Sequence, residues 1–167
     1  MESRNGGSGG MKGKVVMVTG ANAGMGKEIS LALAGMGANL VMVSRDRERG
    51  AAARKDVIST TSNQQVELLL ADLSSQDSIR RLVREFNGKH DRLHVLGNHA
   101  GMSLPTRQET VDGIETVFAT NHLGPFLLTN LLIPVLTASA PSRVVTVSSG
   151  VQAMAKIDFE DLQGTKS

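Results

Sequence analysis

The sequence predicts an α/β fold in which about five parallel strands form a doubly wound sheet. Three observations predict it. Short runs of β-branched and aliphatic residues recur along the chain, as expected of strands that are buried on both faces. Stretches with helical spacing separate these runs, and parallel strands need such crossover connections. A glycine-rich segment stands directly between the first apolar run and the first helical pattern.

The first half of the chain alternates strand and helix. The first strand is expected at 15–19 ("VVMVT"). In the helix that follows, Gly37 stands where a C-cap is expected, and apolar residues recur at helical spacing, namely Ile29, Ala32, Leu33 and Met36. A second strand is expected at 39–44 ("NLVMVS"), and a charged, alanine-rich helix from Arg47 to about Ile58. The third strand is expected at 66–71 ("VELLLA").

The second half continues the alternation. Ser74 and Asp77 resemble a capping box before a helical apolar face, formed by Ile79, Leu82, Val83 and Phe86. A fourth strand is expected at 93–98 ("LHVLGN"), a long helical stretch from about Gly113 to Leu136, and a fifth strand at 143–148 ("RVVTVS"). The fifth strand would form an exposed apolar edge, which favours self-association.

Composition limits the domain organisation and the class of protein. The 167 residues fit one domain, and we expect a flexible Gly/Ser-rich tail at 1–10 followed by a single domain at 11–167. Aromatic residues make up 2% of the chain, so the core must be mainly aliphatic. Charges of both signs are interspersed, which argues against a nucleic-acid surface. No apolar run reaches the roughly 18 residues of a membrane span, so a cytoplasmic protein is expected.

The segment "TGANAGMG" predicts a phosphate-binding loop. Its glycines, Gly20, Gly24 and Gly26, lie between a strand and a helix. There the backbone can approach an anion closely, and the helix N-terminus offers free N–H groups. The alternative is a tight strand-to-helix turn, and the spacing differs from the more familiar Gly-x-Gly-x-x-Gly. The strand and helix on either side favour the nucleotide site.

The residues after the second strand indicate which dinucleotide is bound. An Asp or Glu about 20 residues after the glycines would accept a hydrogen bond from a ribose 2′-hydroxyl. Ser44 and Arg45 occupy that place, and a guanidinium suits a 2′-phosphate, so NADP is predicted. Asp46 leaves NAD as the weaker option. The alternative for Arg45 is a solvated surface charge, as we expect for Arg47 and Arg49.

Five motifs in order resemble the short-chain dehydrogenase/reductase family. They are "TGANAGMG", "ADLSS", "LGNHAG", "TNHLGPFLLT" and "VVTVSS", and the resemblance extends from Lys12 to the C-terminus. "FATNHLGPFLLT" and "IDFEDLQG" resemble the retinol-dehydrogenase-like branch, whose members interconvert alcohols and carbonyl compounds. The resemblance implies a Rossmann-like dinucleotide-binding domain, incomplete at its C-terminal end, that acts on a small-molecule alcohol or carbonyl substrate.

The resemblance also implies the site residues. Ser149 would steady the substrate oxygen, and Asn121 would organise a water molecule. The cofactor-binding residues would be Thr19, Gly20, Asn22, Ala23, Gly24, Met25 and Gly26 in the loop, Ser44 and Arg45, Asp72 and Leu73 beside the adenine, and Asn98, Ala100 and Gly101. The four histidines lack metal-site spacing, so no metal is expected.

Pro125 is expected to matter for Asn121. A proline has no N–H, so the carbonyl four residues earlier, that of Asn121, would stay free to hold a water molecule. A simple proline kink is the alternative, and Pro134 shows that prolines also occur elsewhere in this region.

The chain departs from the family pattern after the fourth strand. Gly97 replaces an aliphatic residue and is expected to loosen the end of that strand. His99 replaces the second Asn of the family's Asn-Asn-Ala-Gly segment. It is either a tolerated polar substitution or a ligand or proton carrier.

A further departure concerns the family's Tyr-x-x-x-Lys motif, because the sequence contains no tyrosine. One alignment places that motif at 162–166 ("LQGTK"), and the alignment we favour places it beyond residue 167. Two functions follow. One is an NADP-dependent oxidoreductase truncated before the motif and inactive as these 167 residues; the other is a non-catalytic nucleotide-binding or regulatory module.

Overall fold

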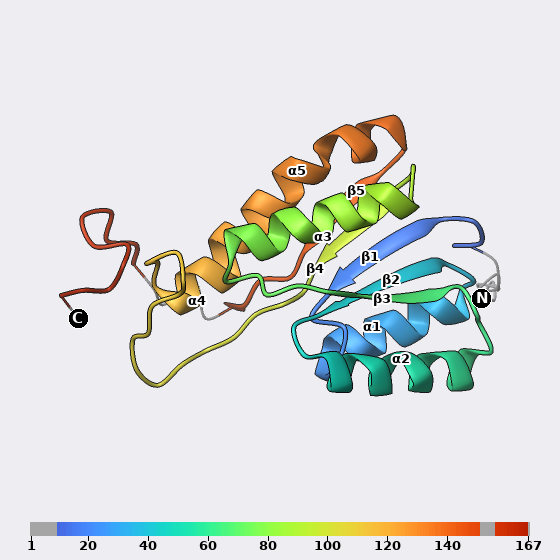
Figure 1. Cartoon of the computed structure of the whole chain (residues 1–167), viewed down its shortest axis with the longest axis horizontal. Helices are drawn as coiled ribbons and strands as arrows, with labels where there is room; N and C mark the ends of the chain where they lie inside the picture. The colour runs from blue at the N-terminus through green and yellow to red at the C-terminus, as the bar shows by residue number, and fades with distance from the viewer. Residues whose placement is uncertain (1–9, 151–155, 167) are drawn as a thin grey trace, which may run out of the picture.

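The computed structural model describes residues 10–150 and 156–166, so the tail expected at 1–10 lies, apart from Gly10, outside the described residues. Five strands form one parallel sheet in the order β3-β2-β1-β4-β5 (Figure 1). The strands are β1 (Val15–Thr19), β2 (Asn39–Ser44), β3 (Val66–Leu70), β4 (Val95–Asn98) and β5 (Arg143–Thr146). The predicted parallel sheet is confirmed. Its strand order reverses between β1 and β4, which are neighbours.

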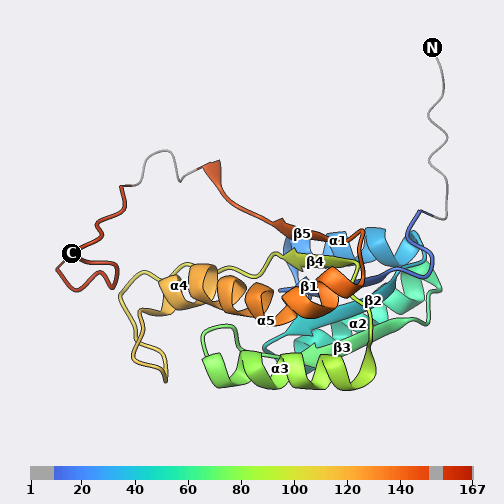
Figure 2. The same ribbon diagram turned by 90° about the horizontal axis from the view of Figure 1, so that it is seen from above.

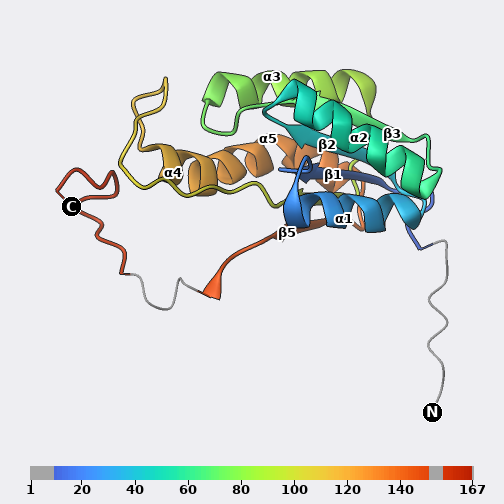
Figure 3. The ribbon, with the colours of Figure 1, turned by 90° about the horizontal axis from the view of Figure 1, so that it is seen from below.

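Helices cover both faces of the sheet. In Figure 1, α1 (Gly24–Gly35) and α2 (Arg47–Thr61) lie below the sheet, and α3 (Gln76–Lys89) and α5 (Gly124–Ala138) lie above it. Figures 2 and 3 show the same layers from two opposite sides. This two-sided cover explains why β1 is buried along its whole length and why its sequence is continuously apolar rather than alternating.

The core has two halves, one on each face of the sheet. Toward α3 and α5, the side chains of Met17, Val43, Leu69 and Leu96 pack with Ile79, Phe86, Leu128 and Leu132. Toward α1 and α2, Val16, Val18, Leu40 and Met42 pack with Ala34, Ala53 and Val57. Phe86 is the one aromatic residue among the buried residues of the described ranges. The expected aliphatic core is confirmed.

The prediction of one continuous helix from about Gly113 to Leu136 is wrong. Gly113 has a φ of +69° in a turn, and α4 (Thr116–Phe118) starts only after Glu115, whose carboxylate accepts from the N–H groups of Val117 and Phe118. A π-helical turn, η1 (Ala119–Leu123), then precedes α5. Its last hydrogen bond runs from the Gly124 N–H to the Ala119 carbonyl, five residues back, just before Pro125.

Two smaller expectations are also corrected. The N-cap of α3 is Ser75, not Ser74, because the Ser75 hydroxyl accepts from the Ser78 N–H while the Ser74 hydroxyl donates to Asp72. Gly97 does not loosen β4. It pairs with Val18 of β1 on one side and with Val145 of β5 on the other, so backbone pairing on both sides holds it.

β5 forms one edge of the sheet, and all four of its residues are exposed. The side chains of Val144 and Val145 are 43% and 52% exposed. The segment 156–166 lies beyond α4, away from β5, where the Arg107 Nε donates to the Gln163 carbonyl at 2.8 Å (Figure 2). The expected apolar edge is therefore present in the described part of the chain.

Candidate functional site

A cavity of about 330 Å³ opens at the carboxyl ends of β1 to β4, around the point where the strand order reverses. Ligands of open α/β sheets bind at such a switch point. Of the residues that the sequence predicts to bind a cofactor, the cavity is lined by Thr19, Gly20, Asn22, Ala23, Arg45, Asp72, Leu73, Ala100 and Gly101. Gly24, Met25, Gly26, Ser44 and Asn98 do not line it.

The glycine loop fits a closely approaching ligand because two of its glycines admit no side chain. Gly20 has a φ of +67°, and a Cβ there would lie 2.8 Å from the Cα of Ala100. A Cβ on the buried Gly26 would clash with the carbonyl oxygen of Gly20. α1 starts at Gly24, and its N-cap, Ala23, makes no side-chain capping bond. The first N–H groups of α1 are thus available to an anion such as a diphosphate.

Thr19 holds the two sides of the cavity together. Its buried hydroxyl accepts from the N–H groups of His99 and Ala100, both at 3.0 Å, and donates to the Gly97 carbonyl at 3.4 Å. The end of β1 is therefore tied to the segment after β4. This side chain therefore fixes the spacing between these two parts of the cavity wall.

Asp72 organises the wall after β3. Its Oδ1 accepts from the N–H of Ser74 at 2.9 Å and from the Ser74 hydroxyl at 2.7 Å. Its own N–H donates to the Ser78 hydroxyl. Leu73 is 6% exposed and offers the apolar surface next to it. This wall combines a fixed carboxylate with an apolar side chain, which suits a flat heterocycle such as adenine.

The rim after β2 carries charge of both signs. Arg45, Asp46 and Arg49 line the cavity there. Ser44 is buried, and its hydroxyl donates to the Asp46 carbonyl, so it stabilises the backbone of this rim. Arg49 is exposed, as expected of a solvated charge, and it also lines the rim of the cavity. Its spacing of four residues from Arg45, just after a strand end, is the sequence signal that could have indicated this.

The two predicted catalytic residues lie outside the cavity. The Asn121 side chain pairs with the backbone of Met102, because its Oδ1 accepts from the Met102 N–H and its Nδ2 donates to the Met102 carbonyl, both at 2.8 Å. Asn121 thereby anchors the segment after β4. Ser149 follows β5 and is exposed. Thr120, which precedes Asn121 on η1, does line the cavity, although it was not among the predicted site residues.

Buried polar atoms at this edge of the sheet also indicate a polar ligand. Within residues 10–150 and 156–166, the buried side-chain atoms without a hydrogen-bond partner are Asn98 Oδ1, His99 Nε2 and Thr120 Oγ1. All three belong to the end of β4 or to η1, and His99 and Thr120 line the cavity. Unpartnered buried polar groups are rare and need a physical explanation. Together with the glycine cradle, they show that the residues present fit a dinucleotide.

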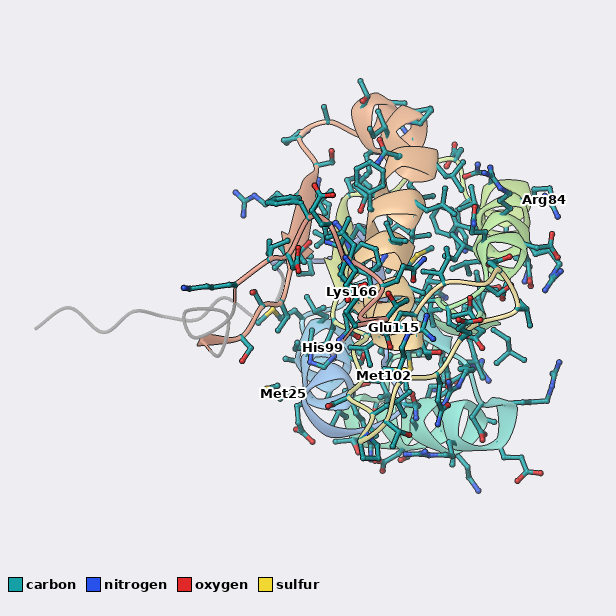
Figure 4. The ribbon with its side chains drawn as sticks, turned by 90° about the vertical axis from the view of Figure 1, so that its left-hand side faces the viewer. Met25, Arg84, His99, Met102, Glu115 and Lys166 are labelled. Atoms are coloured by element: carbon teal, nitrogen blue, oxygen red, sulfur yellow. The ribbon has the colours of Figure 1, made fainter. Side chains whose placement is uncertain are left out.

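The His99 ring packs against the first turn of α1, where Gly26 leaves room for it (Figure 4). A Cβ at Gly26 would lie 2.9 Å from the His99 Nδ1. The Nε2 atom is buried and has no hydrogen-bond partner within the described residues, and the residue lines the cavity. Packing against Gly26 fits a tolerated polar substitution, whereas the unpartnered Nε2 fits a contact to a ligand, and a His99→Ala variant distinguishes the two.

Metal sites and membrane spans were searched for in the described residues. No group of His, Cys, Asp and Glu in those ranges is arranged to hold a metal ion. None of the helices in those ranges combines the length and the apolar character that crossing a bilayer requires.

Known proteins are similar to this chain in sequence. The family model for short chain dehydrogenases matches residues 14–161. Human retinol dehydrogenase 11 is 46% identical over 156 residues, which are 93% of this chain and 49% of that protein. The chain spans about half the length of the curated relatives it matches.

Solved structures agree with these relatives. The crystal structure of an uncharacterized protein from Mycobacterium paratuberculosis superposes with a TM-score of 0.79 at 39% identity, covering 93% of this chain and 53% of that one. A metagenomic short-chain oxidoreductase in complex with NADP superposes with a TM-score of 0.74 at 27% identity, covering 83% of this chain and 63% of that one.

Proposed function

The chain belongs to the short chain dehydrogenase family, and we propose that it forms the cofactor-binding part of an NADP-dependent oxidoreductase that interconverts an alcohol and a carbonyl compound. Its sequence is that of the retinol-dehydrogenase-like branch. The similarity to retinol dehydrogenases supports the proposed substrate class. The cytoplasm remains our proposed location.

The observation that carries the proposal is the cavity at the switch point of the sheet. The loop from Gly20 to Gly24 and the N-terminus of α1 would hold the diphosphate, and Asp72 with Leu73 would flank the adenine. Arg45 would face the 2′-phosphate, which supports NADP over NAD. When bound, the nicotinamide ring of the cofactor accepts or supplies a hydride.

Reduction of a carbonyl needs a proton as well as a hydride, and the question of which residue donates it leads to a second candidate function. The 167 residues contain no tyrosine, which in the family's Tyr-x-x-x-Lys motif supplies this proton. Lys166 lies in the C-terminal segment, with its N–H bound to Asp161. A positioned acid contributes about 10²–10⁴-fold to such a step, so we propose that these residues alone bind the cofactor and transfer hydride poorly. A non-catalytic nucleotide-binding module would behave in the same way.

Titration of the purified chain with NADPH and NADH tests the cofactor. We expect NADPH to bind more tightly, and Arg45→Asp to narrow or reverse the preference, since a charge-assisted contact contributes about 1.5–3 kcal/mol. Arg47→Asp makes the same charge change outside the cavity and should leave the preference unchanged. Equal affinities that Arg45→Asp does not alter would remove Arg45 from the site.

An absorbance assay of NADPH with a panel of aldehydes and ketones tests the chemistry. We expect binding without useful turnover by the 167 residues, and turnover by a version extended through the family's Tyr and Lys. Turnover by the short chain that disappears in His99→Ala would make His99 the acid and overturn the proposal of inactivity. Binding without turnover in both versions would favour the module.

A further inference from the structure

We infer that the protein has a second binding site, for an uncharged aromatic molecule that carries one hydrogen-bond donor, such as an indole or a phenol. The site is a cavity of about 230 Å³ between α3, the start of α5 and the loop at 109–115. Among the described residues, Leu73 alone lines both this cavity and the dinucleotide cavity. The inference therefore goes beyond the proposed function and can be tested without a dinucleotide.

The backbone holds the walls of the second cavity in place. The Gln76 N–H, at the start of α3, donates to the Oδ2 of Asp112 in the 109–115 loop at 2.8 Å, and an isolated β-bridge joins the two ends of this loop. Gly124, at the start of α5, packs on the segment after β3, because a Cβ there would lie 2.5 Å from the Leu73 carbonyl oxygen. Since these backbones already touch, α5 cannot move closer to that segment and fill the space.

The lining of the second cavity is mainly apolar. The apolar side chains around it are those of Leu73, Ile79, Ile114, Leu123, Phe126 and Leu127. Within residues 10–150 and 156–166, none of the buried side-chain atoms without a hydrogen-bond partner belongs to a residue that lines it. An apolar cavity of about 150 Å³ with a Leu, Ile and Phe lining stays dry and binds benzene. The space therefore suits an apolar ring rather than a nucleotide or an ion.

Two residues at the rim determine which kind of ring fits. The Phe126 side chain is 63% exposed, so it can stack on a flat ligand. Asp112 is exposed, the Gln76 N–H occupies its Oδ2, and in the described part of the chain no hydrogen bond or ion pair involves its Oδ1. That oxygen can accept from an N–H or O–H of the ligand, and its charge repels an anion. An indole or a phenol meets these conditions, and an aromatic carboxylate does not.

Leu73 connects the second site to the dinucleotide cavity. A ring that packs against Leu73 restricts its motion, so a dinucleotide would then bind to a wall that is already ordered. Occupancy of either cavity should tighten binding in the other by the same factor, because coupling between two sites is reciprocal. This consequence, unlike the site itself, rests on the proposed function.

An NMR titration of the purified 167-residue chain with indole tests the site. The methyl signals of Ile114 and Leu127 should shift together, with a dissociation constant on the order of 1 mM, and nuclear Overhauser contacts from indole to these methyl groups should place the ring. Ile114→Phe fills the cavity and should weaken indole by about tenfold or more. Val111→Phe, the matched control from the same loop, changes a side chain that is 88% exposed and should leave indole binding unchanged.

Toluene and benzoate test the class of ligand. Toluene has no donor, so Asp112→Asn should weaken indole by about fivefold and leave toluene unchanged, while the Asn oxygen still accepts from the Gln76 N–H. Benzoate should bind more weakly than toluene. Thermal unfolding of each variant shows that it is folded before binding is compared.

The outcomes separate the site, its ligand class and its coupling. Absent indole binding, wild-type contacts to methyl groups elsewhere, or equal losses in Ile114→Phe and Val111→Phe would overturn the site. Benzoate that binds as well as toluene would overturn the ligand class. Saturating indole should tighten NADPH by about fivefold, and an unchanged NADPH affinity would overturn the coupling alone. A chain that binds indole but no NADPH would overturn the proposed function and leave the second site standing.

Discussion

Gly20 and Gly97 both lie near the site, but only one of the two positions requires a glycine. Gly20 adopts a φ of +67°, and an added Cβ would lie 2.8 Å from the Ala100 backbone. Gly97 lies inside β4, and its nearest neighbour to an added Cβ is the Met17 carbonyl oxygen at 3.4 Å, an ordinary contact. Gly20 is therefore required by the fold, whereas Gly97 leaves room for a methyl group.

Substitution by alanine should separate the two positions. Gly20→Ala should lower the free energy of unfolding by about 1–3 kcal/mol, because it combines a strained φ with a backbone clash. Gly97→Ala should be neutral or raise it by about 0.4–1 kcal/mol, because alanine restricts the unfolded chain. Urea unfolding measures both. A similar loss in both variants would contradict the geometry.

His94 gives the protein a pH-dependent residue. The Val15 N–H, at the start of β1, donates to its Nδ1 at 3.0 Å. Burial lowers the pKa of His94, and the nearby charges of Lys14 and Arg92 lower it further. The neutral ring is thus the form that the folded chain stabilises.

The free energy of unfolding should fall as the pH falls from 7 through the lowered pKa of His94. Above the unfolded pKa of about 6.5, the contribution is complete, and it is lost once the folded ring is protonated. His94→Asn keeps an acceptor oxygen near Val15 without titrating, so urea unfolding of this variant should lack that part of the pH dependence. An identical profile in both proteins would exclude His94 as its source.

At the scale of elements, η1 is the segment that the sequence described least well. The glycine loop and Arg45 could be predicted because a backbone approach and a charge after a strand are local requirements. The interruption of the long helix could not be predicted in this way, because it depends on three features together. Gly113 forms a turn, Glu115 caps α4, and Pro125 lacks an N–H. Thr120 and Arg49 were missed for a related reason. Where their side chains lie depends on where their helices start.

Pro125→Ala tests the origin of η1. An N–H at position 125 could donate to the Asn121 carbonyl, four residues back, and so convert the π turn into α-helix. The free energy of unfolding should rise by about 1 kcal/mol. Because Asn121 would rotate, hydrogen exchange at the Met102 N–H, which now donates to Asn121, should become faster.

Pro134→Ala is the matched control, since Pro134 also lies in α5 and is exposed. It should leave the exchange of Met102 unchanged. In a version extended through the family's Tyr and Lys, Pro125→Ala should slow turnover without abolishing cofactor binding. Unaltered turnover would mean that the Asn121 carbonyl has no catalytic role.

At the scale of the whole molecule, the alternation of strands and helices was enough to predict the parallel sheet and its two helical layers. Continuous apolar runs such as 15–19 are typical of strands that are buried on both faces of a parallel sheet. Helix caps and ends were predicted less well, as Ser75 shows, because neighbouring hydroxyl groups compete for the same N–H groups.

The exposed edge at β5 leads us to propose that the 167 residues associate with each other at high concentration. Val145→Lys should shift sedimentation velocity toward the monomer, because a charge on an edge strand opposes pairing. Val111→Lys places the same charge on a loop residue that is 88% exposed and should have no effect. A wild-type chain that stays monomeric at all concentrations would contradict the proposal.

Among the residues that the structure describes, those that line the dinucleotide cavity all lie between Thr19 and Thr120. During translation, every side chain of this wall is therefore made before α5 and β5 exist. A ligand at 100 times its dissociation constant adds about 2.7 kcal/mol of stability to the form that binds it. The nucleotide would thus be able to act on the growing polypeptide as a folding aid, at a stage when the protein has no completed sheet and no chemistry to perform.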